Sequence, residues 1–321
     1  MSRFTQDPAS LRRVGAVSRA ENVLGFRSGA VWCSSNLGHL VRIEPDGSQS
    51  TWGDIPGGQP TSMALLDDGS VLTNNTSDGL VYRIHPDGSH EVAISTSDGR
   101  PVGAVNYVLR DGRDRIWLAV RTREPRPGGF DVRGEGYIAV TDRLGEEPRT
   151  VAEGLLFPNE IKLSADDEHA YVPETLGRRV QRFRVTEDGL ADPEVFGPSD
   201  LGPGGYPDGV TPDAEGNLWV ALPNRNGLAV ITADGGVETV FEEPVPDAIE
   251  AFDREWESGT ITFPALMATA GREIAMPTSI AFAGPDLRTA YVGSLKMPHL
   301  LSFDSPTAGI PMTHQREASA S

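Results

Sequence analysis

The chain contains a single cysteine, Cys33, so no disulfide bond within the chain can stabilise its fold. Cys33 lies in the apolar run AVWCSS without an accompanying His or Asn motif, so we expect a buried side chain and not a nucleophile. No apolar stretch reaches the length of a membrane span, and the N-terminal residues lack the apolar core of a secretory signal. These absences predict a globular, cytoplasmic protein.

Basic residues are also scarce. The 28 Lys and Arg residues are outnumbered by 46 Asp and Glu residues, which gives a formal net charge of −18. Phosphate backbones and anionic membrane surfaces attract proteins with an excess of positive charge, so we expect neither nucleic acid nor a membrane as a partner. A small-molecule substrate remains as the expected partner, and the sequence leaves the oligomeric state open.

Helical periodicity is nearly absent, and a repeat takes its place. Each copy has short runs rich in Val, Ile, Leu, Trp and Tyr, separated by turn residues such as Asp-Gly. Repeats of four antiparallel strands at intervals of roughly 40–50 residues are typical of propeller blades. The sequence predicts an all-β, six-bladed β-propeller that forms a single domain over residues 1–321, with RRVGAVSRA (12–20) closing the last blade. The six copies lie at residues 20–48, 60–89, 105–120, 158–189, 207–236 and 277–305.

Two stretches interrupt the repeat. The first, at about residues 121–137, is rich in Arg, and the second, at about 242–277, contains PDAIEAFDREWESG, which we expect to form a short helix. Long connections in compact domains often act as lids over a site. Phe263, Leu266 and Met267 could line such a lid, or they could simply pack on the edges of the blades.

Polar residues occupy the same place in every copy. Because the first strand of each blade lines the central channel, these residues should converge around one axis. Two carboxylates and two carboxamides among them form a set of hard oxygen ligands that suits Ca²⁺ best, with Mg²⁺, Mn²⁺ or Zn²⁺ as alternatives. Asn and Asp after Pro are also ordinary turn formers, which is the competing interpretation. The matched positions are Glu21, Thr61, Asn106, Asn159, Asp208 and Thr278.

Three segments resemble the gluconolactonase/senescence-marker-protein (regucalcin) family of six-bladed propellers. They are LFPNEIKLSADDEHAYVPET (156–175), YPDGVTPDAEGNLWVAL (206–222) and MPTSIAFAGPDLRTAYVGS (276–294). The resemblance implies a catalytic divalent cation in the channel with Glu21, Asn159 and Asp208 as ligands. It also implies that Asn106 contacts the metal or the substrate.

The chain departs from the family pattern at several positions. Glu21 is followed by Asn-Val instead of Gly-Pro, Glu160 stands where the family has Gly, and Ala104 stands where sugar lactonases have Arg. The last departure argues against a sugar lactone as substrate. Arg121, Arg123 or Arg126 in the first insertion could replace the missing Arg.

The resemblance implies metal-assisted hydrolysis of a lactone or related ester. The cation would act as Lewis acid and Asp208 as general base or nucleophile. We expect Asn106, Arg121, Arg123 and Glu160 to contact the substrate. No Gly-x-Ser-x-Gly elbow is present, which argues against a serine hydrolase. Two alternatives stay open, namely a non-hydrolytic reaction (cyclisation, isomerisation or dehydration) in the same cage, and a binding propeller without catalysis.

Overall fold

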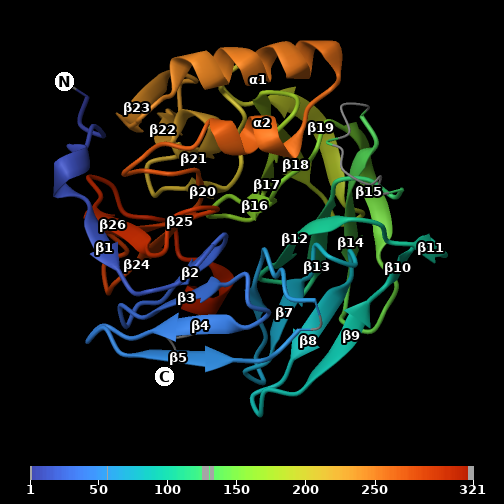
Figure 1. Ribbon diagram of the computed structural model, residues 1–321. Helices are drawn as coiled ribbons and strands as arrows, with labels where there is room; N and C mark the ends of the chain where they lie inside the picture. The colour runs from blue at the N-terminus through green and yellow to red at the C-terminus, as the bar shows by residue number, and fades with distance from the viewer. Residues whose placement is uncertain (1, 56, 125–129, 131–133, 317–321) are drawn as a thin grey trace.

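The computed structural model describes residues 2–55, 57–124, 130 and 134–316. Six four-stranded antiparallel sheets surround one axis, as the ribbon diagram shows (Figure 1). This arrangement confirms the predicted six-bladed propeller. In five of the sheets the blade's first strand in the sequence lies next to the axis, and the other three follow outward in sequence order. In the sixth sheet the order is β24, β25, β26 and then β1 from the N-terminal segment.

The first three blades follow one another along the chain. Blade one consists of β2 (Val23–Gly25), β3 (Val31–Ser34), β4 (Leu40–Ile43) and β5 (Gln49–Trp52). Blade two consists of β6 (Ala64–Leu65), β7 (Val71–Asn74), β8 (Val81–Ile84) and β9 (His90–Ile94). A small hairpin of β10 (Thr96–Ser97) and β11 (Arg100–Pro101) precedes blade three. Blade three consists of β12 (Val105–Arg110), β13 (Ile116–Val120), β14 (Gly136–Thr141) and β15 (Arg149–Leu155).

The last three blades carry the helices. Blade four consists of β16 (Lys162–Leu163), β17 (His169–Glu174), β18 (Arg179–Val185) and β19 (Leu190–Val195). Blade five consists of β20 (Val210–Pro212), β21 (Leu218–Leu222), β22 (Gly227–Ile231) and β23 (Val237–Phe241). Blade six contains β24 (Pro277–Ala283), β25 (Thr289–Ser294) and β26 (Leu300–Asp304). The helices are α1 (Pro246–Ser258), α2 (Phe263–Ala268), α3 (Thr313–Arg316) and the 3-10 turns η1 (Pro8–Ser10) and η2 (Pro223–Arg225).

An N-terminal strand closes the ring. β1 (Arg12–Val14) pairs antiparallel with β26 and so supplies the fourth strand of blade six, as expected for the segment 12–20. The chain before β1 continues onto blade five, where the buried ring of Phe4 meets Trp219 edge to face at a centroid distance of 5.5 Å. Both ends of the chain therefore contribute to the same closure, which leaves the first and last blades joined.

Aspartates at the hairpins of blades three and five tie the turns to the core. The indole Nε1 of Trp117 donates to Asp111 at 2.9 Å, and Trp219 donates in the same way to Asp213 at 3.2 Å. Both tryptophans are fully buried, so each carboxylate satisfies a donor that would otherwise be unpaired in the core. Cys33 is also buried, as expected, and burial raises the pKa of its thiol to about 12.

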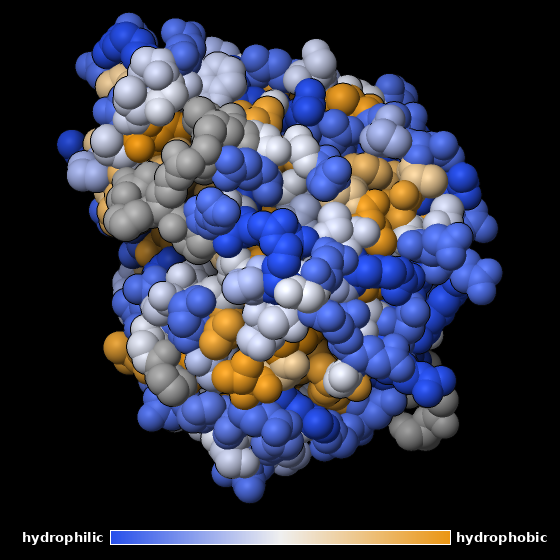
Figure 2. Space-filling view, turned by 90° about the vertical axis from the view of Figure 1, so that its right-hand side faces the viewer, coloured by the Kyte–Doolittle hydropathy of each residue, from blue (hydrophilic) through white to orange (hydrophobic). Residues whose placement is uncertain are grey.

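The outer surface is largely polar where it can be seen in space-filling form. Figure 2 shows hydrophilic side chains over most of one side, with hydrophobic ones in small areas between them. Among the described residues, no helix has both the length and the apolar character needed to cross a bilayer.

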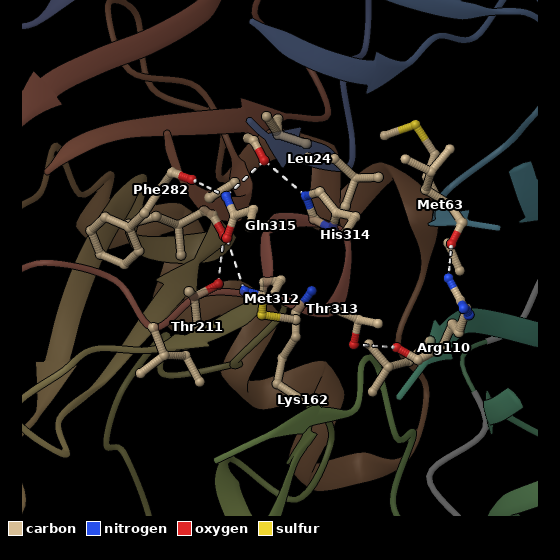
Figure 3. Close-up of a pocket in the computed structure, with 18 of the residues that line it drawn as sticks. Leu24, Met63, Arg110, Lys162, Thr211, Phe282, Met312, Thr313, His314 and Gln315 are labelled. Atoms are coloured by element: carbon tan, nitrogen blue, oxygen red, sulfur yellow. Dashed lines mark hydrogen bonds between the residues drawn. The ribbon is translucent and has the colours of Figure 1, made fainter. Parts of the chain in front are cut away.

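The C-terminal helix closes one end of the central channel. The side chain of Gln315 lies inside the ring, where its Nε2 donates to the carbonyl oxygens of Gly25 at 2.7 Å and of Phe282 at 2.9 Å (Figure 3). Arg316 anchors the same turn to blade four through an ion pair with Asp167 at 2.8 Å. A cavity of only about 40 Å³ remains beside α3, so this end of the channel is nearly filled.

The C-terminal helix α3 contains a histidine that should make its packing against the end of the channel depend on pH. The ring Nε2 of His314 lies 2.8 Å from the carbonyl oxygen of Gly25. Burial, together with the charge of Lys162, lowers the pKa of His314 to about 4. The unfolded chain binds a proton at His314 at a higher pH than the folded protein does, because the folded-state pKa is lowered. The free energy of unfolding is therefore unaffected by His314 above about pH 6.5 and falls as the pH falls towards 4.

We therefore expect acid to weaken the wild type more than a variant that cannot titrate here. Between pH 7 and pH 4, His314→Gln should lose about 2 kcal/mol less unfolding free energy than the wild type, as measured by urea denaturation. His90→Gln, at an exposed position of β9, is the matched control and should follow the wild type. Equal pH dependence of the wild type and His314→Gln would contradict the assignment.

Candidate active site

A second cavity, of about 270 Å³, opens at the other end of the channel. Residues near the starts of the inner strands line it, whereas residues near the ends of these strands line the cavity beside α3. Four of the six matched polar residues meet in its lining: Glu21, Asn106, Asn159 and Asp208. The structure thus brings together side chains that are far apart in the sequence, as the repeat predicts.

The residue after proline lies where the chain enters each blade. The backbone N–H of Asn159 donates to the carbonyl of Pro173 at 3.0 Å, and that of Asp208 donates to Ala221 at 3.0 Å. Each acceptor belongs to the second strand of the same blade, so the backbone is fixed while the side chain lines the cavity. Phe157, two residues before Asn159, has a φ of 60°, a strained conformation that often occurs next to functional residues.

A set of hydrogen bonds orients the carboxamides. The Nδ2 of Asn106 donates to both the Oδ1 and the carbonyl oxygen of Asn159, each at 2.9 Å. Thr61 and Thr278, the other two matched residues, do not line the cavity. Their hydroxyls donate instead to the carbonyl oxygens of Asn106 at 3.0 Å and of Glu21 at 2.7 Å. The two threonines therefore hold the backbone of residues that face the cavity.

The two carboxylates lie in an unfavourable environment for negative charge. Burial, followed by the charges of Glu21 and Glu160, raises the pKa of Asp208 well above its usual value, although Asn159 and Arg19 partly oppose this. Burial also raises the pKa of Glu21, against the effect of Arg19, which forms an ion pair with it at 2.8 Å. A bound cation would relieve both carboxylates, because opposite charge favours the ionised form.

The donor set of the cavity fits a hard divalent cation. It offers the carboxylates of Glu21 and Asp208 and the carboxamide oxygens of Asn106 and Asn159, with no thiolate and no imidazole in the lining. The oxygen of Asn159 retains a second lone pair beside the hydrogen bond from Asn106. Within the described ranges, no group of three or more His, Cys, Asp or Glu side chains could hold a metal. Such a site therefore depends on the carboxamides.

Glu160 does not lie in the lining of this cavity, where we expected it to contact a substrate. Its buried carboxylate accepts from the Nδ2 of Asn22 and from the backbone N–H of Val210, both at 3.2 Å. Its charge is matched by the Nζ of Lys162 at 3.6 Å, and Lys162 in turn donates to the hydroxyl of Tyr107. Glu160 acts on the cavity through its charge, which raises the pKa of Asp208.

The arginines of the first insertion lie in different places. Arg121 lines the cavity, and its guanidinium lies over the ring of Phe157 at 5.3 Å from the centroid. Burial lowers the pKa of Arg121, whereas the charge of Glu21 raises it. Arg123 lies outside this cavity because it pairs with Asp98 at 2.7 Å, so the geometry gives no support to its expected substrate contact. Arg126 falls outside the described residues.

The second insertion covers part of the cavity. Phe252 of α1 and both Phe263 and Leu266 of α2 belong to its lining, beside Tyr206 from the loop before β20. Figure 1 shows both helices over the end of blades four and five. Met267 is not part of the lining, so only two of the three residues named from the sequence face the site.

Some lining residues escape sequence reasoning. Asn224 in η2 is buried, and its Nδ2 finds no hydrogen-bond partner in the part of the chain that the structure describes. Arg19 enters the lining from the segment before blade one. Neither residue belongs to a matched position of the repeat, and no motif signals them.

A comparison with known protein families shows to which family the chain belongs. Residues 27–251 match the SMP-30/gluconolactonase/LRE-like region, which is more than half of the sequence. The chain belongs to this family. The family predicted from the sequence is thereby confirmed, and two of the three segments that indicated it, 156–175 and 206–222, lie inside the matched residues.

Related proteins include two lactonases. The chain is 25% identical over 269 residues to the 6-deoxy-6-sulfogluconolactonase of Pseudomonas putida, with 82% of this chain and 78% of the relative covered. It is 29% identical over 264 residues to a pentonolactonase of Haloferax volcanii, with 81% and 75% covered. A calcium-binding regucalcin of Agrobacterium tumefaciens has a similar fold, with a TM-score of 0.67, 18% identity, and 93% and 94% of the two chains covered.

The electrostatics of the cavity predict an unusual effect of removing a charge. Since the folded-state pKa of Asp208 is raised, ionisation of this residue destabilises the metal-free protein as the pH rises through that pKa. In excess EDTA at pH 8, Asp208→Asn should therefore unfold with a free energy about 1–3 kcal/mol higher than the wild type.

A matched substitution at the surface should have the opposite sign. Hydrogen bonds from Thr232 and the backbone of Gly236 lower the pKa of the exposed Asp234 carboxyl. Asp234→Asn should therefore be neutral or slightly destabilising under the same conditions. If Asp208→Asn proved less stable than the wild type in EDTA, the ionised carboxylate of Asp208 would not destabilise the metal-free protein, and the prediction would be wrong.

Proposed function

We propose that the chain hydrolyses a lactone or a related ester with the help of a divalent cation held by Glu21, Asn106, Asn159 and Asp208. The observation that carries the proposal is the meeting of two carboxylates with raised pKa and two carboxamides in one cavity at the axis. Membership of the family and the two lactonase relatives support the reaction class. We propose Ca²⁺ as the ion, since the donors are all oxygens of uncharged or carboxylate groups.

A cation bound by these oxygens supplies a Lewis acid for the carbonyl group of the substrate. Asp208 takes a proton from water as the water oxygen attacks the carbonyl carbon. The bond between this carbon and the ring oxygen then breaks, and the proton on Asp208 passes to the leaving alkoxide. The product is a hydroxy acid, and Asp208 returns to its ionised form.

The side chains around Asp208 would position the substrate for this step. Arg121 has a buried Nε–H without a hydrogen-bond acceptor among the described residues, so this group would donate a hydrogen bond to an oxygen of the substrate or of the product carboxylate. The helices α1 and α2 would limit the access of bulk water to the bound ring.

Asp208 could instead attack the carbonyl carbon directly. A single turnover in oxygen-labelled water separates the two roles. Label in the Asp208 carboxylate with an unlabelled first hydroxy acid indicates a nucleophile, whereas label in the first hydroxy acid and none in Asp208 is the result expected for a base.

The proposal is tested by hydrolysis of lactones and aryl esters with and without metal. We expect the purified protein to lose activity in EDTA and to regain it with Ca²⁺, Mg²⁺, Mn²⁺ or Zn²⁺ added singly. Asp208→Asn should lower kcat/KM by about a hundred- to ten-thousandfold, as loss of a general base does. Asp234→Asn, at an exposed turn, should behave as the wild type.

Two results would count against the proposal. Hydrolysis that is unaffected by EDTA would remove the role of the cation, and full activity of Asp208→Asn would remove the role of this carboxylate. A protein that binds one divalent ion but hydrolyses no substrate of either class would favour a non-hydrolytic reaction or a binding propeller.

A further inference from the structure

The lining of the cavity contains two chemically different groups of residues. Besides the oxygens described above, it includes a group of apolar residues, called here the apolar wall: Phe157, Leu176, Tyr206, Phe252, Phe263 and Leu266. Five of these residues are purely hydrocarbon in their side chains, and only Tyr206 carries a polar group. The wall comes from three loops, one of which is the turn between β17 and β18 of blade four, and from α1 and α2 of the second insertion.

The polar atoms behind the wall are already paired with the protein. The hydroxyl of Tyr206 donates to Asp253 at 2.6 Å, which directs it away from a ligand in the cavity. The indole Nε1 of Trp256, behind Leu176, donates to the Leu176 carbonyl at 2.9 Å. What the wall offers to a bound molecule is therefore aromatic and aliphatic surface, and not hydrogen bonds.

The wall is also built to keep its shape. The rings of Tyr206 and Phe252 meet edge to face at 4.9 Å, and Tyr206 lies 6.2 Å from Trp256 in the same manner. Leu176, Tyr206 and Phe252 are at most 3% exposed, so they form a packed cluster beneath α1. These three residues support the wall, and its accessible surface comes mainly from Phe157, Phe263 and Leu266. A supported apolar surface binds apolar ligands at a smaller cost of ordering flexible side chains.

The exposure of Phe263 is a second, independent observation that indicates an apolar ligand. It is the first residue of α2 and lines the cavity, yet 58% of its surface is exposed. An aromatic side chain at the rim of a cavity gains stability when an apolar group of a ligand covers it. The other large exposed hydrophobic residues of the described chain, such as Leu37, do not line this cavity.

We propose that the substrate of this site is a lactone or ester that carries an apolar substituent, an alkyl chain or an aromatic ring, which binds against the apolar wall. This inference rests on the proposed hydrolysis for the polar half of the substrate and on the wall for the other half. A polyhydroxylated ring would leave its hydroxyl groups without partners along the wall, which disfavours its binding.

The dimensions of the cavity limit the size of the substituent. A volume of about 270 Å³ lies near the lower end of the range of ligand cavities. It accommodates a small ring with one short chain or one phenyl group, and not a large polycyclic molecule.

The first experiment compares γ-lactones that are unsubstituted or carry an ethyl, butyl or hexyl chain, beside a polyhydroxylated sugar lactone. With the Ca²⁺-loaded protein, kcat/KM should rise about three- to fourfold per added methylene until the wall is covered. The sugar lactone should be the poorest substrate. A flat series, or a preference for the sugar lactone, would overturn the inference while leaving the hydrolase proposal intact.

A variant of the wall supplies the second arm. Phe263→Gln removes apolar surface at an exposed position, where the fold should tolerate the change. We expect the ratio of kcat/KM between the hexyl-substituted and the unsubstituted lactone to fall about three- to tenfold. Leu37→Gln, also at an exposed position but away from the cavity, is the matched control and should keep the wild-type ratio. An unchanged ratio in Phe263→Gln would contradict the role of the wall.

A binding measurement separates failure of the inference from failure of the proposed function. If no lactone is hydrolysed, calorimetric titration with cyclopentanone and hexylcyclopentanone, which cannot be hydrolysed, tests the wall alone. Tighter binding of the hexyl compound to the wild type than to Phe263→Gln would support the apolar site even though the hydrolase proposal had failed. Equal binding of both ketones to the wild type would overturn the inference.

Discussion

The pairing of β1 with β26 holds the two ends of the chain together, and the geometry of the site depends on that closure. A closed ring points the start of every inner strand at one axis, so Glu21 and Asp208, separated by most of the chain, share a cavity. Because both carboxylates are buried there, each raises the electrostatic cost of the other. The fold thus brings two carboxylates together at one end of the channel, beside Arg19 and Arg121, and α3 fills the other end.

Much of this arrangement follows from the sequence because it repeats. Asn159 and Asp208 occupy equivalent places in two blades, and knowledge of the blade period is enough to bring their side chains to the same axis. The closing strand was predictable for the same reason, since blade six lacked an outer strand. Thr61 and Thr278 show the limit of the argument: they hold equivalent places, but they support the backbone of their neighbours instead of facing the cavity.

The remaining features depend on side-chain directions and loop paths that a repeat does not specify. Glu160 follows Asn159 directly, yet it turns into the channel wall because Lys162 and Asn22 offer it partners there. Arg123 is drawn to Asp98 and away from the site. Asn224 and the residues of the apolar wall lie in turns, loops and helices, away from the matched positions of the repeat. Their positions depend on loop paths and on how α1 and α2 pack. For this region the sequence predicted only a short helix and left open whether the insertion covers the site.

The cation cage is the central claim, and anomalous X-ray scattering from crystals soaked in Mn²⁺ tests it most directly. Data collected on both sides of the manganese absorption edge should give one strong peak in the channel. We expect this peak in contact with the carboxylates of Glu21 and Asp208 and with the carboxamide oxygen of Asn159. No peak in the channel, or peaks only at carboxylates of the outer surface, would contradict the account and leave the axial residues with a purely structural role.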